Sequence, residues 1–198
     1  MRPASARCGR PTRRGEPIDV ERARAQHREY EERLSEAGFA VLRLPADPSY
    51  PDSVFVEDAA LVLDEAAVLT RPGAATRRPE VESISTVLSA YRPLLRIQAP
   101  GTLDGGDVLR VGRKLYVGLS SRTNRAGVSQ VQALLDRWAY EVIPVDVNGC
   151  LHLKSAVTQV ADHMLLINAR LVRPECFAPM ETIAVSPAEP DGANALLV

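Results

Sequence analysis

Short apolar runs with the period of a strand recur along this chain in pairs, and a tight polar turn joins the members of each pair. The pairs follow one another at a spacing of about 49 residues, which indicates an internal structural repeat. The predicted hairpins are Ala60–Leu63 with Ala67–Thr70, Val108–Val111 with Leu115–Gly118, and Val157–Val160 with Met164–Ile167. Their turns contain Asp64-Glu65, Arg113-Lys114 and Asp162-His163. One supersecondary unit is therefore expected three times.

A segment with helical spacing and one further strand follow each hairpin. Pro79 suits the first turn of a helix, and Thr123 or Asn124 can cap a second one. The apolar faces of these two helices are Val81, Ile84, Leu88 and Tyr91, and Val128, Val131, Leu135 and Trp138. Prolines interrupt the third segment, from Leu171 to Met180. The closing strands are expected at Leu94–Ile97, Val142–Val145 and Thr182–Val185, so each unit contains strand, strand, helix and strand.

Both ends of the chain carry parts of the same pattern. Asp19 can cap a helix, and a strand is predicted after it at Phe39–Leu44. A last strand is predicted at Ala195–Val198. We interpret residues 1–16 as an irregular N-terminal segment and residues 17–198 as a single α/β domain with three complete and two partial units.

A cluster of polar residues precedes the first strand of each hairpin. The clusters are Asp52, Glu57 and Asp58, then Asp104 and Asp107, then His152 and Lys154. If the units close around an axis, these equivalent positions meet, and they line a central cleft that suits a small cation. Taken singly, each acid is better explained as a turn residue, and His152, between two leucines, as a buried structural histidine. Their recurrence at one phase of the repeat favours a shared site.

A cleft of carboxylates with one imidazole points to guanidinium compounds as substrates. A guanidinium group is planar, remains charged and pairs bidentately with carboxylates. Hydrolysis of one of its C–N bonds needs a nucleophile for the central carbon and an acid that protonates the departing amine. His152 can be that acid and later the base for water, while Asp104 would orient the imidazole and raise its pKa.

Composition excludes several classes of partner. The 198 residues carry 24 basic and 25 acidic side chains, so the net charge of -1 indicates neither nucleic acid nor a membrane surface as a partner. No apolar run reaches the roughly 20 residues of a membrane-spanning helix. The three cysteines, Cys8, Cys150 and Cys176, form no C-x-x-C pair, so neither a disulfide framework nor a metal site is indicated. We expect a cytoplasmic protein without a cofactor.

Five segments of the chain carry a resemblance to a known family. They are Pro51-Asp52-Ser53-Val54-Phe55-Val56-Glu57-Asp58, Thr70-Arg71-Pro72-Gly73-Ala74 with Arg77-Arg78, Thr102-Leu103-Asp104-Gly105-Gly106-Asp107, Arg122-Thr123-Asn124 and Leu151-His152-Leu153-Lys154. In this order they resemble the dimethylarginine dimethylaminohydrolases of the pentein superfamily. The resemblance implies a propeller of strand-strand-helix-strand units around a pseudo-fivefold axis, incomplete in this chain.

The resemblance also implies roles for individual residues. By resemblance, Glu57 and Asp58 contact the guanidinium end of the substrate, and Asp52 contacts its amino group. Arg77 and Arg122 would lie near the substrate's carboxylate, although each is equally explained as a solvated loop arginine. These binding roles are in addition to the acid/base pair predicted for His152 and Asp104.

The attacking group is where the sequence departs from the family. The family uses a cysteine close to its C-terminus, beyond the strand expected at the end of this chain, and an opening hairpin is also absent, so the chain looks truncated at both ends. Cys150 is the alternative nucleophile, but neighbouring positions on an extended segment point to opposite faces, and residues two apart lie about 6 to 7 Å apart along the backbone. Cys150 and Cys176 are better explained as small buried hydrophobic residues.

The sequence supports three functional hypotheses. The first is hydrolysis of dimethylarginine or monomethylarginine to citrulline and a methylamine through a cysteine thiouronium intermediate, with this chain inactive alone. The second is an arginine deiminase or amidinotransferase of the same superfamily. The third is a catalytically dead guanidinium-binding module or a gene remnant. Whether the chain forms a homodimer stays open.

Overall fold

The computed structural model describes residues 19–197; residues 1–18 and 198 lie outside the described part, and so does the irregular segment expected over residues 1–16. The described residues form two compact units, residues 19–46 and residues 47–197. The single domain expected over residues 17–198 stays a prediction.

The unit of residues 19–46 contains one helix and an extended segment. Helix α1 spans Val20–Glu36, and the Asp19 carboxylate caps it by accepting a hydrogen bond from the backbone N–H of Arg22 at 3.0 Å. The helix predicted from Asp19 is therefore confirmed. The strand predicted at Phe39–Leu44 is wrong, since these residues form no strand. A strand needs a partner ladder for its backbone groups, and the described part of this unit supplies none.

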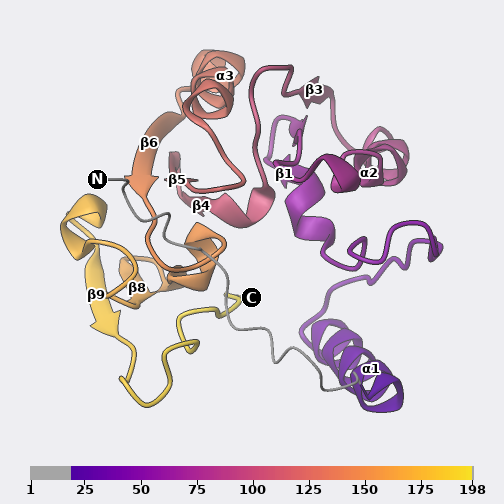
Figure 1. Ribbon diagram of the computed structural model, residues 1–198, viewed down its shortest axis with the longest axis horizontal. Coiled ribbons are helices and arrows are strands. Elements are labelled where there is room, and N and C mark those ends of the chain that lie inside the picture. Colours follow the sequence, from indigo (N-terminus) through magenta and orange to yellow (C-terminus); the bar gives the residue numbers. More distant parts are fainter. Residues whose placement is uncertain (1–18, 198) are drawn as a thin grey trace, which may run out of the picture. The chain divides into compact units, whose positions relative to one another are not determined.

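The unit of residues 47–197 contains three sheets of three strands each (Figure 1). The strands are β1 (Ala60–Val62), β2 (Ala67–Leu69) and β3 (Leu94–Arg96), β4 (Val108–Val111), β5 (Lys114–Leu119) and β6 (Glu141–Asp146), and β7 (Val157–Ala161), β8 (Met164–Ile167) and β9 (Glu181–Ala184). In each sheet the first two strands form an antiparallel hairpin, and the third pairs in parallel with the second. The three predicted hairpins and their closing strands are confirmed.

The parallel pairing requires a crossover connection within each unit. Helix α2 (Glu80–Leu88) joins β2 to β3, and α3 (Arg125–Leu135) joins β5 to β6. Asn124 is the cap of α3, because its side-chain oxygen accepts from the Gly127 N–H at 2.8 Å. Tyr91 was expected on the buried face of α2, but the helix ends before it and 65% of its surface is exposed. Among the described residues, no helix has the length and apolar character needed to cross a membrane.

The third connection is short because prolines interrupt it. It contains only a 3-10 turn at Pro174–Phe177. After β9 the predicted last strand is wrong for residues 195–197, which form no strand, while residue 198 lies outside the described part. The chain there is attached to β7 instead, since Thr158 Oγ1 donates to the Ala193 carbonyl at 2.6 Å and accepts from the Ala195 N–H at 3.2 Å.

The buried apolar side chains lie between neighbouring sheets. Strand β5 shows the arrangement, because Leu115 and Val117 belong to the cluster shared with the first sheet, whereas Tyr116 belongs to the cluster shared with the third. The Tyr116 ring packs on Phe177 with ring centroids 4.9 Å apart. Each sheet therefore buries its surface against the next, as repeat proteins do, and this packing holds the starts of β1, β4 and β7 together.

Candidate active site

A 3-10 turn precedes the first strand of each sheet, and these turns carry the polar clusters. The turns are η1 (Val56–Ala59) before β1, η3 (Gly105–Asp107) before β4, and η5 (Leu153–Ser155) before β7. Turn η3 contacts both η1 and η5, and η1 also contacts α2. The strands β1 and β4 that follow η1 and η3 lie next to each other in Figure 1. Equivalent positions of the three repeats therefore meet in one place.

Three predicted residues come together at this meeting point. Asp58 lies in η1, Asp104 directly before η3, and His152 directly before η5. His152 Nε2 lies 3.1 Å from Asp104 Oδ2 and 3.9 Å from Asp58 Oδ1. Both carboxylates are buried, and 14% of the His152 side chain is exposed. Each repeat thus supplies one member of a buried carboxylate, carboxylate and imidazole cluster.

Two glycines allow this close approach. A Cβ on Gly106 would lie 2.8 Å from His152 Nδ1 and 2.8 Å from Asp58 Oδ1, and one on Gly105 would lie 1.9 Å from the Glu57 carbonyl oxygen. The Gly106 N–H also donates to Asp58 Oδ1 at 2.9 Å. The Gly-Gly pair between Asp104 and Asp107 is thus required for the turns to touch.

The surroundings of His152 favour its protonated form. Burial of the imidazole alone would lower its pKa, because it removes water from the charged form. The hydrogen bond to Asp104 and the negative charges of Asp58, Asp107 and Asp104 act in the opposite direction and outweigh burial. The pKa of His152 is therefore raised above its ordinary value, which suits a residue that has to donate a proton.

Asp58 is held by a buried arginine, Arg77, for which the sequence predicts a different role. Arg77 Nη1 donates to Asp58 Oδ2 at 2.5 Å, and Arg77 Nε and Nη2 donate to Glu80 Oε2 at 3.0 and 2.8 Å. Burial would lower the pKa of Arg77, but its bonds to Glu80 and Asp58 outweigh burial and raise it. In this structure Arg77 orients Asp58 on the side away from His152, while its expected contact with the substrate's carboxylate stays a prediction.

Asp104 is fixed by its own set of contacts. Its Oδ1 accepts from the Gly73 N–H at 2.9 Å, and its backbone N–H donates to Thr123 Oγ1 at 3.1 Å. Arg122 Nη1 lies 3.8 Å from Asp104 Oδ2, which places this predicted residue beside the cluster with 27% of its side chain exposed. Arg122 is therefore near enough to act on a ligand that touches Asp104.

The remaining members of the predicted clusters lie around this centre. Glu57 and Lys154 form an ion pair that joins the first repeat to the third. Asp52 is exposed, and its backbone carbonyl accepts from Arg77 Nη2 at 3.1 Å. The roles expected for Asp52 and Glu57 in substrate binding stay predictions.

Asp107 belongs to the structural support of the site. It is fully buried and accepts from Ser120 Oγ at 2.6 Å, from Thr123 Oγ1 at 2.7 Å and from the Leu153 N–H at 2.9 Å. Burial raises the pKa of its carboxyl group and outweighs these three hydrogen bonds. Asp107 belongs to the polar cluster predicted from the sequence, but its hydrogen-bond partners follow no repeat spacing and could not be predicted.

Cys150 is the cysteine nearest to His152 in sequence among the described residues. It is buried in the apolar cluster between the second and third sheets, and its Sγ donates to the His152 carbonyl oxygen at 3.3 Å. This agrees with the expectation that Cys150 is a small buried residue. Its thiol is directed at the backbone of His152.

The ligand atoms of Asp58, Asp104 and His152 lie within 4.8 Å of one another, so these three side chains are also the set that could surround a metal ion in the described part of the chain. The direct contact between His152 and Asp104 is equally the geometry of an acid/base pair. That contact makes proton transfer the chemistry that the arrangement supports best.

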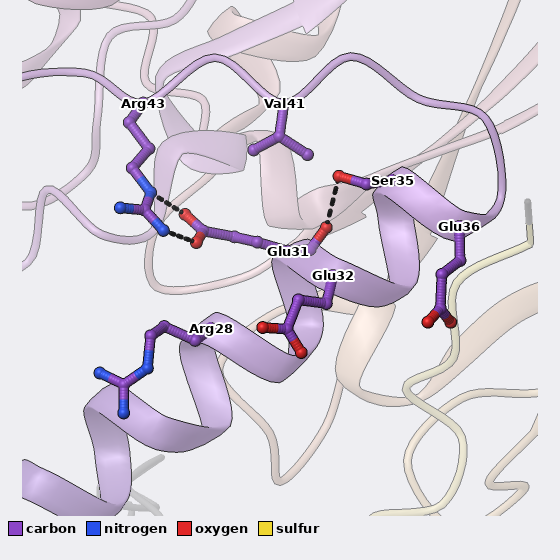
Figure 2. A pocket seen from close by; sticks show the side chains of 7 residues that line it. All are labelled: Arg28, Glu31, Glu32, Ser35, Glu36, Val41 and Arg43. Carbon is purple, nitrogen blue, oxygen red and sulfur yellow. Dashed lines mark hydrogen bonds and ion pairs between the residues drawn. The ribbon is translucent and has the colours of Figure 1, made fainter.

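A separate groove of about 670 Å³ lies within the unit of residues 19–46 (Figure 2). One edge of the Arg43 guanidinium group, Nε and Nη2, donates to both oxygens of the Glu31 carboxylate, and Ser35 Oγ donates to the Glu31 carbonyl at 3.0 Å. The hydrogen bond from Arg43 lowers the pKa of Glu31. This groove contains none of the predicted site residues.

Comparison with known proteins identifies relatives of the chain. A family model described as N,N dimethylarginine dimethylhydrolase, eukaryotic, matches residues 7–176. The N(G),N(G)-dimethylarginine dimethylaminohydrolase of Pseudomonas aeruginosa is 36% identical over 186 residues, which are 93% of this chain and 73% of that protein. The protein of the same name from Streptomyces coelicolor is 42% identical over 148 residues, or 74% of this chain and 57% of that protein.

The structural comparison agrees with the sequence comparison. The crystallised cysteine-to-serine mutant of DDAH from Pseudomonas aeruginosa, complexed with citrulline, matches with a TM-score of 0.86 at 36% identity. The match covers 91% of this chain and 71% of that chain. The expected fold class, an α/β fold of pentein type, is therefore confirmed.

The raised pKa of His152 can be measured directly. In Asp104→Asn the hydrogen-bonding carboxylate is lost while burial remains, so we expect the pKa of His152 to fall. The measurement is an NMR titration of the imidazole, with the exposed Asp162→Asn as the matched control that leaves the titration unchanged. A raised pKa also means that protonated His152 stabilises the fold at pH below about 6.5, and that this stabilisation is lost as the pH rises through the folded-state pKa. An unchanged titration in Asp104→Asn would show that the pair is not formed.

The buried Arg77 pair predicts a large stability difference between two arginine substitutions. Arg77→Gln leaves Asp58 and Glu80 buried without their cation, so we expect the free energy of unfolding in urea to fall by about 3 to 5 kcal/mol. Arg96→Gln removes an exposed pair with Glu82 and should cost about 0 to 1 kcal/mol. Equal losses for the two variants would contradict the buried network.

Proposed function

Because the chain belongs to the dimethylarginine dimethylaminohydrolase family, we propose that it binds an N-methylated arginine at Asp58, Asp104 and His152 and takes part in its hydrolysis to citrulline and a methylamine. The observation that carries this proposal is the position of His152 Nε2, 3.1 Å from Asp104 and 3.9 Å from Asp58. The citrulline complex of the Pseudomonas relative supports the product side of the proposal.

The charge of the cluster supports a cationic substrate. When ionised, Asp58, Asp104 and Glu80 carry three negative charges, and Arg77 and Arg122 carry two positive ones. This leaves one negative charge, in addition to the fully buried Asp107, whose raised pKa favours its neutral form. Either a protonated His152 or a guanidinium group can balance that charge. Each carboxylate has about four lone-pair positions, so Asp58 and Asp104 can accept from a guanidinium in addition to their present donors.

His152 would move protons in both halves of the reaction. The attacking thiolate adds one negative charge to the cluster, so protonated His152 and the guanidinium group can be present together. The thiolate attacks the guanidinium carbon, forming the S–C bond, and the C–N bond to the methylamine breaks as protonated His152 gives its proton to the departing nitrogen. The neutral imidazole then takes one proton from water while the oxygen attacks the same carbon. The C–S bond breaks, the sulfur leaves as a thiolate, and the second proton of the water passes through solvent to the released methylamine. The products are citrulline and the methylamine, and His152 ends protonated as it began.

The thiolate itself is not assigned to Cys150. Its Sγ is buried and donates to the backbone of His152, so it is not aimed at the space in front of the imidazole. We propose that Asp58, Asp104 and His152 supply binding and proton transfer, and that the polypeptide of this sequence binds dimethylarginine without releasing citrulline.

Isothermal titration calorimetry with dimethylarginine tests the binding part. The unsubstituted chain should show saturable binding, and Asp58→Asn should weaken it by about tenfold or more, because a hydrogen bond to a charged group contributes about 1.5 to 3 kcal/mol. Asp162→Asn, at an exposed turn, should bind as the unsubstituted chain does. A folded chain that does not bind, or one in which Asp58→Asn binds equally well, would contradict the proposal.

Two further titrations and one assay separate the alternatives. If arginine or agmatine binds more tightly than dimethylarginine, the arginine deiminase or amidinotransferase hypothesis replaces ours. Citrulline release that Cys150→Ser abolishes would show that Cys150 is the nucleophile after all. Binding that His152→Gln leaves unaltered, together with no proton release from His152 on binding, would favour a binding module over an enzyme.

A further inference from the structure

A second cavity lies at the carboxyl ends of β2 and β3, where α2 begins, and has a volume of about 220 Å³. These two strands are parallel and α2 connects them. In α/β sheets, the carboxyl ends of parallel strands with their connecting helices are the usual place for a ligand. The cavity contains none of Asp58, Asp104 and His152, so it is separate from the proposed active site.

Arginines dominate the charge of this cavity. Arg71, Arg78 and Arg96 line it together with a single acid, Glu82. Arg96 is neutralised, because its Nη1 and Nη2 donate to the two Glu82 oxygens at 2.8 and 3.1 Å. Arg71 and Arg78 have no acidic partner among residues 19–197, which leaves a charge of about +2 at one cavity.

Each of these two guanidinium groups is fixed at one end and open at the other. Arg71 Nη1 donates to the Gly101 carbonyl at 3.1 Å, and Arg78 Nε donates to the Pro72 carbonyl at 3.1 Å. Within the described residues, nothing accepts from the remaining N–H groups of either side chain. Pro72, Val81 and Ile97, all buried, form the apolar part of the lining. The arginines are thus oriented before any ligand arrives, which lowers the entropy cost of binding.

We propose that this cavity binds a small oxyanion, a carboxylate or phosphate group, between Arg71 and Arg78. Guanidinium groups match the oxygen geometry of both kinds of anion and form their strongest hydrogen bonds with them. The volume corresponds to about seven water molecules at roughly 30 Å³ each, which is room for one anionic group on a small molecule.

Calorimetry with inorganic phosphate and with succinate, in separate titrations at constant ionic strength, tests this site. We expect saturable binding of at least one probe, and a loss of about tenfold or more in affinity in both Arg71→Gln and Arg78→Gln. Arg125→Gln, which removes the same charge from an exposed position outside the cavity, should bind like the unsubstituted chain. Preference for phosphate over succinate, or the reverse, identifies the chemical source of the anion.

Two results would overturn the proposal. One is the absence of saturable binding of both probes to the folded, unsubstituted chain. The other is an equal loss of affinity in Arg125→Gln and Arg78→Gln, which would show that the anions respond only to net surface charge. Circular dichroism of each variant confirms that it is folded, and Arg78→Gln serves alone if Arg71→Gln does not fold, because the Arg71 backbone also pairs with Leu103.

Discussion

The buried contact between His152 and the carboxylates of Asp104 and Asp58 is the interaction on which the rest of the site depends. Removing three ionisable groups from water is costly unless each finds a partner of opposite charge or a hydrogen-bond donor. Here the partners are one another, the backbone N–H groups of Gly73 and Gly106, and the Arg77 guanidinium. A charge lost from any of the three side chains would leave the others buried and unbalanced.

The packing of the three sheets determines the geometry of the cluster formed by Asp58, Asp104 and His152. Because each 3-10 turn leads directly into a first strand, the positions of Asp58, Asp104 and His152 follow from how β1, β4 and β7 pack. Asp107 connects the second repeat to the third, because its carboxylate accepts a hydrogen bond from the Leu153 N–H at the start of η5. Small shifts between sheets would therefore change the 3.1 Å contact of His152 first.

The repeat explains which features could be predicted from the sequence. Strand pairs and polar positions at one phase of the repeat are periodic, so the hairpins and the positions of Asp58, Asp104 and His152 before the first strands could be derived. The bonds from Arg77 to Asp58 and Glu80, and those of Asp107 to Ser120 and Thr123, are not periodic and depend on the final packing. The strands predicted at residues 39–44 and 195–197 failed because an apolar pattern alone does not supply a pairing partner.

The central claim is that the negative charge of the Asp58 and Asp104 carboxylates stabilises both the protonated form of His152 and a bound guanidinium ligand. If so, a bound guanidinium must lower the affinity of His152 for its proton, and the proton must equally weaken ligand binding. Calorimetry of dimethylarginine binding in buffers of different ionisation enthalpy counts the protons exchanged at each pH. We predict proton release near the pKa of His152, absent in His152→Gln. Tight binding with no proton exchange across that pH range would contradict the account.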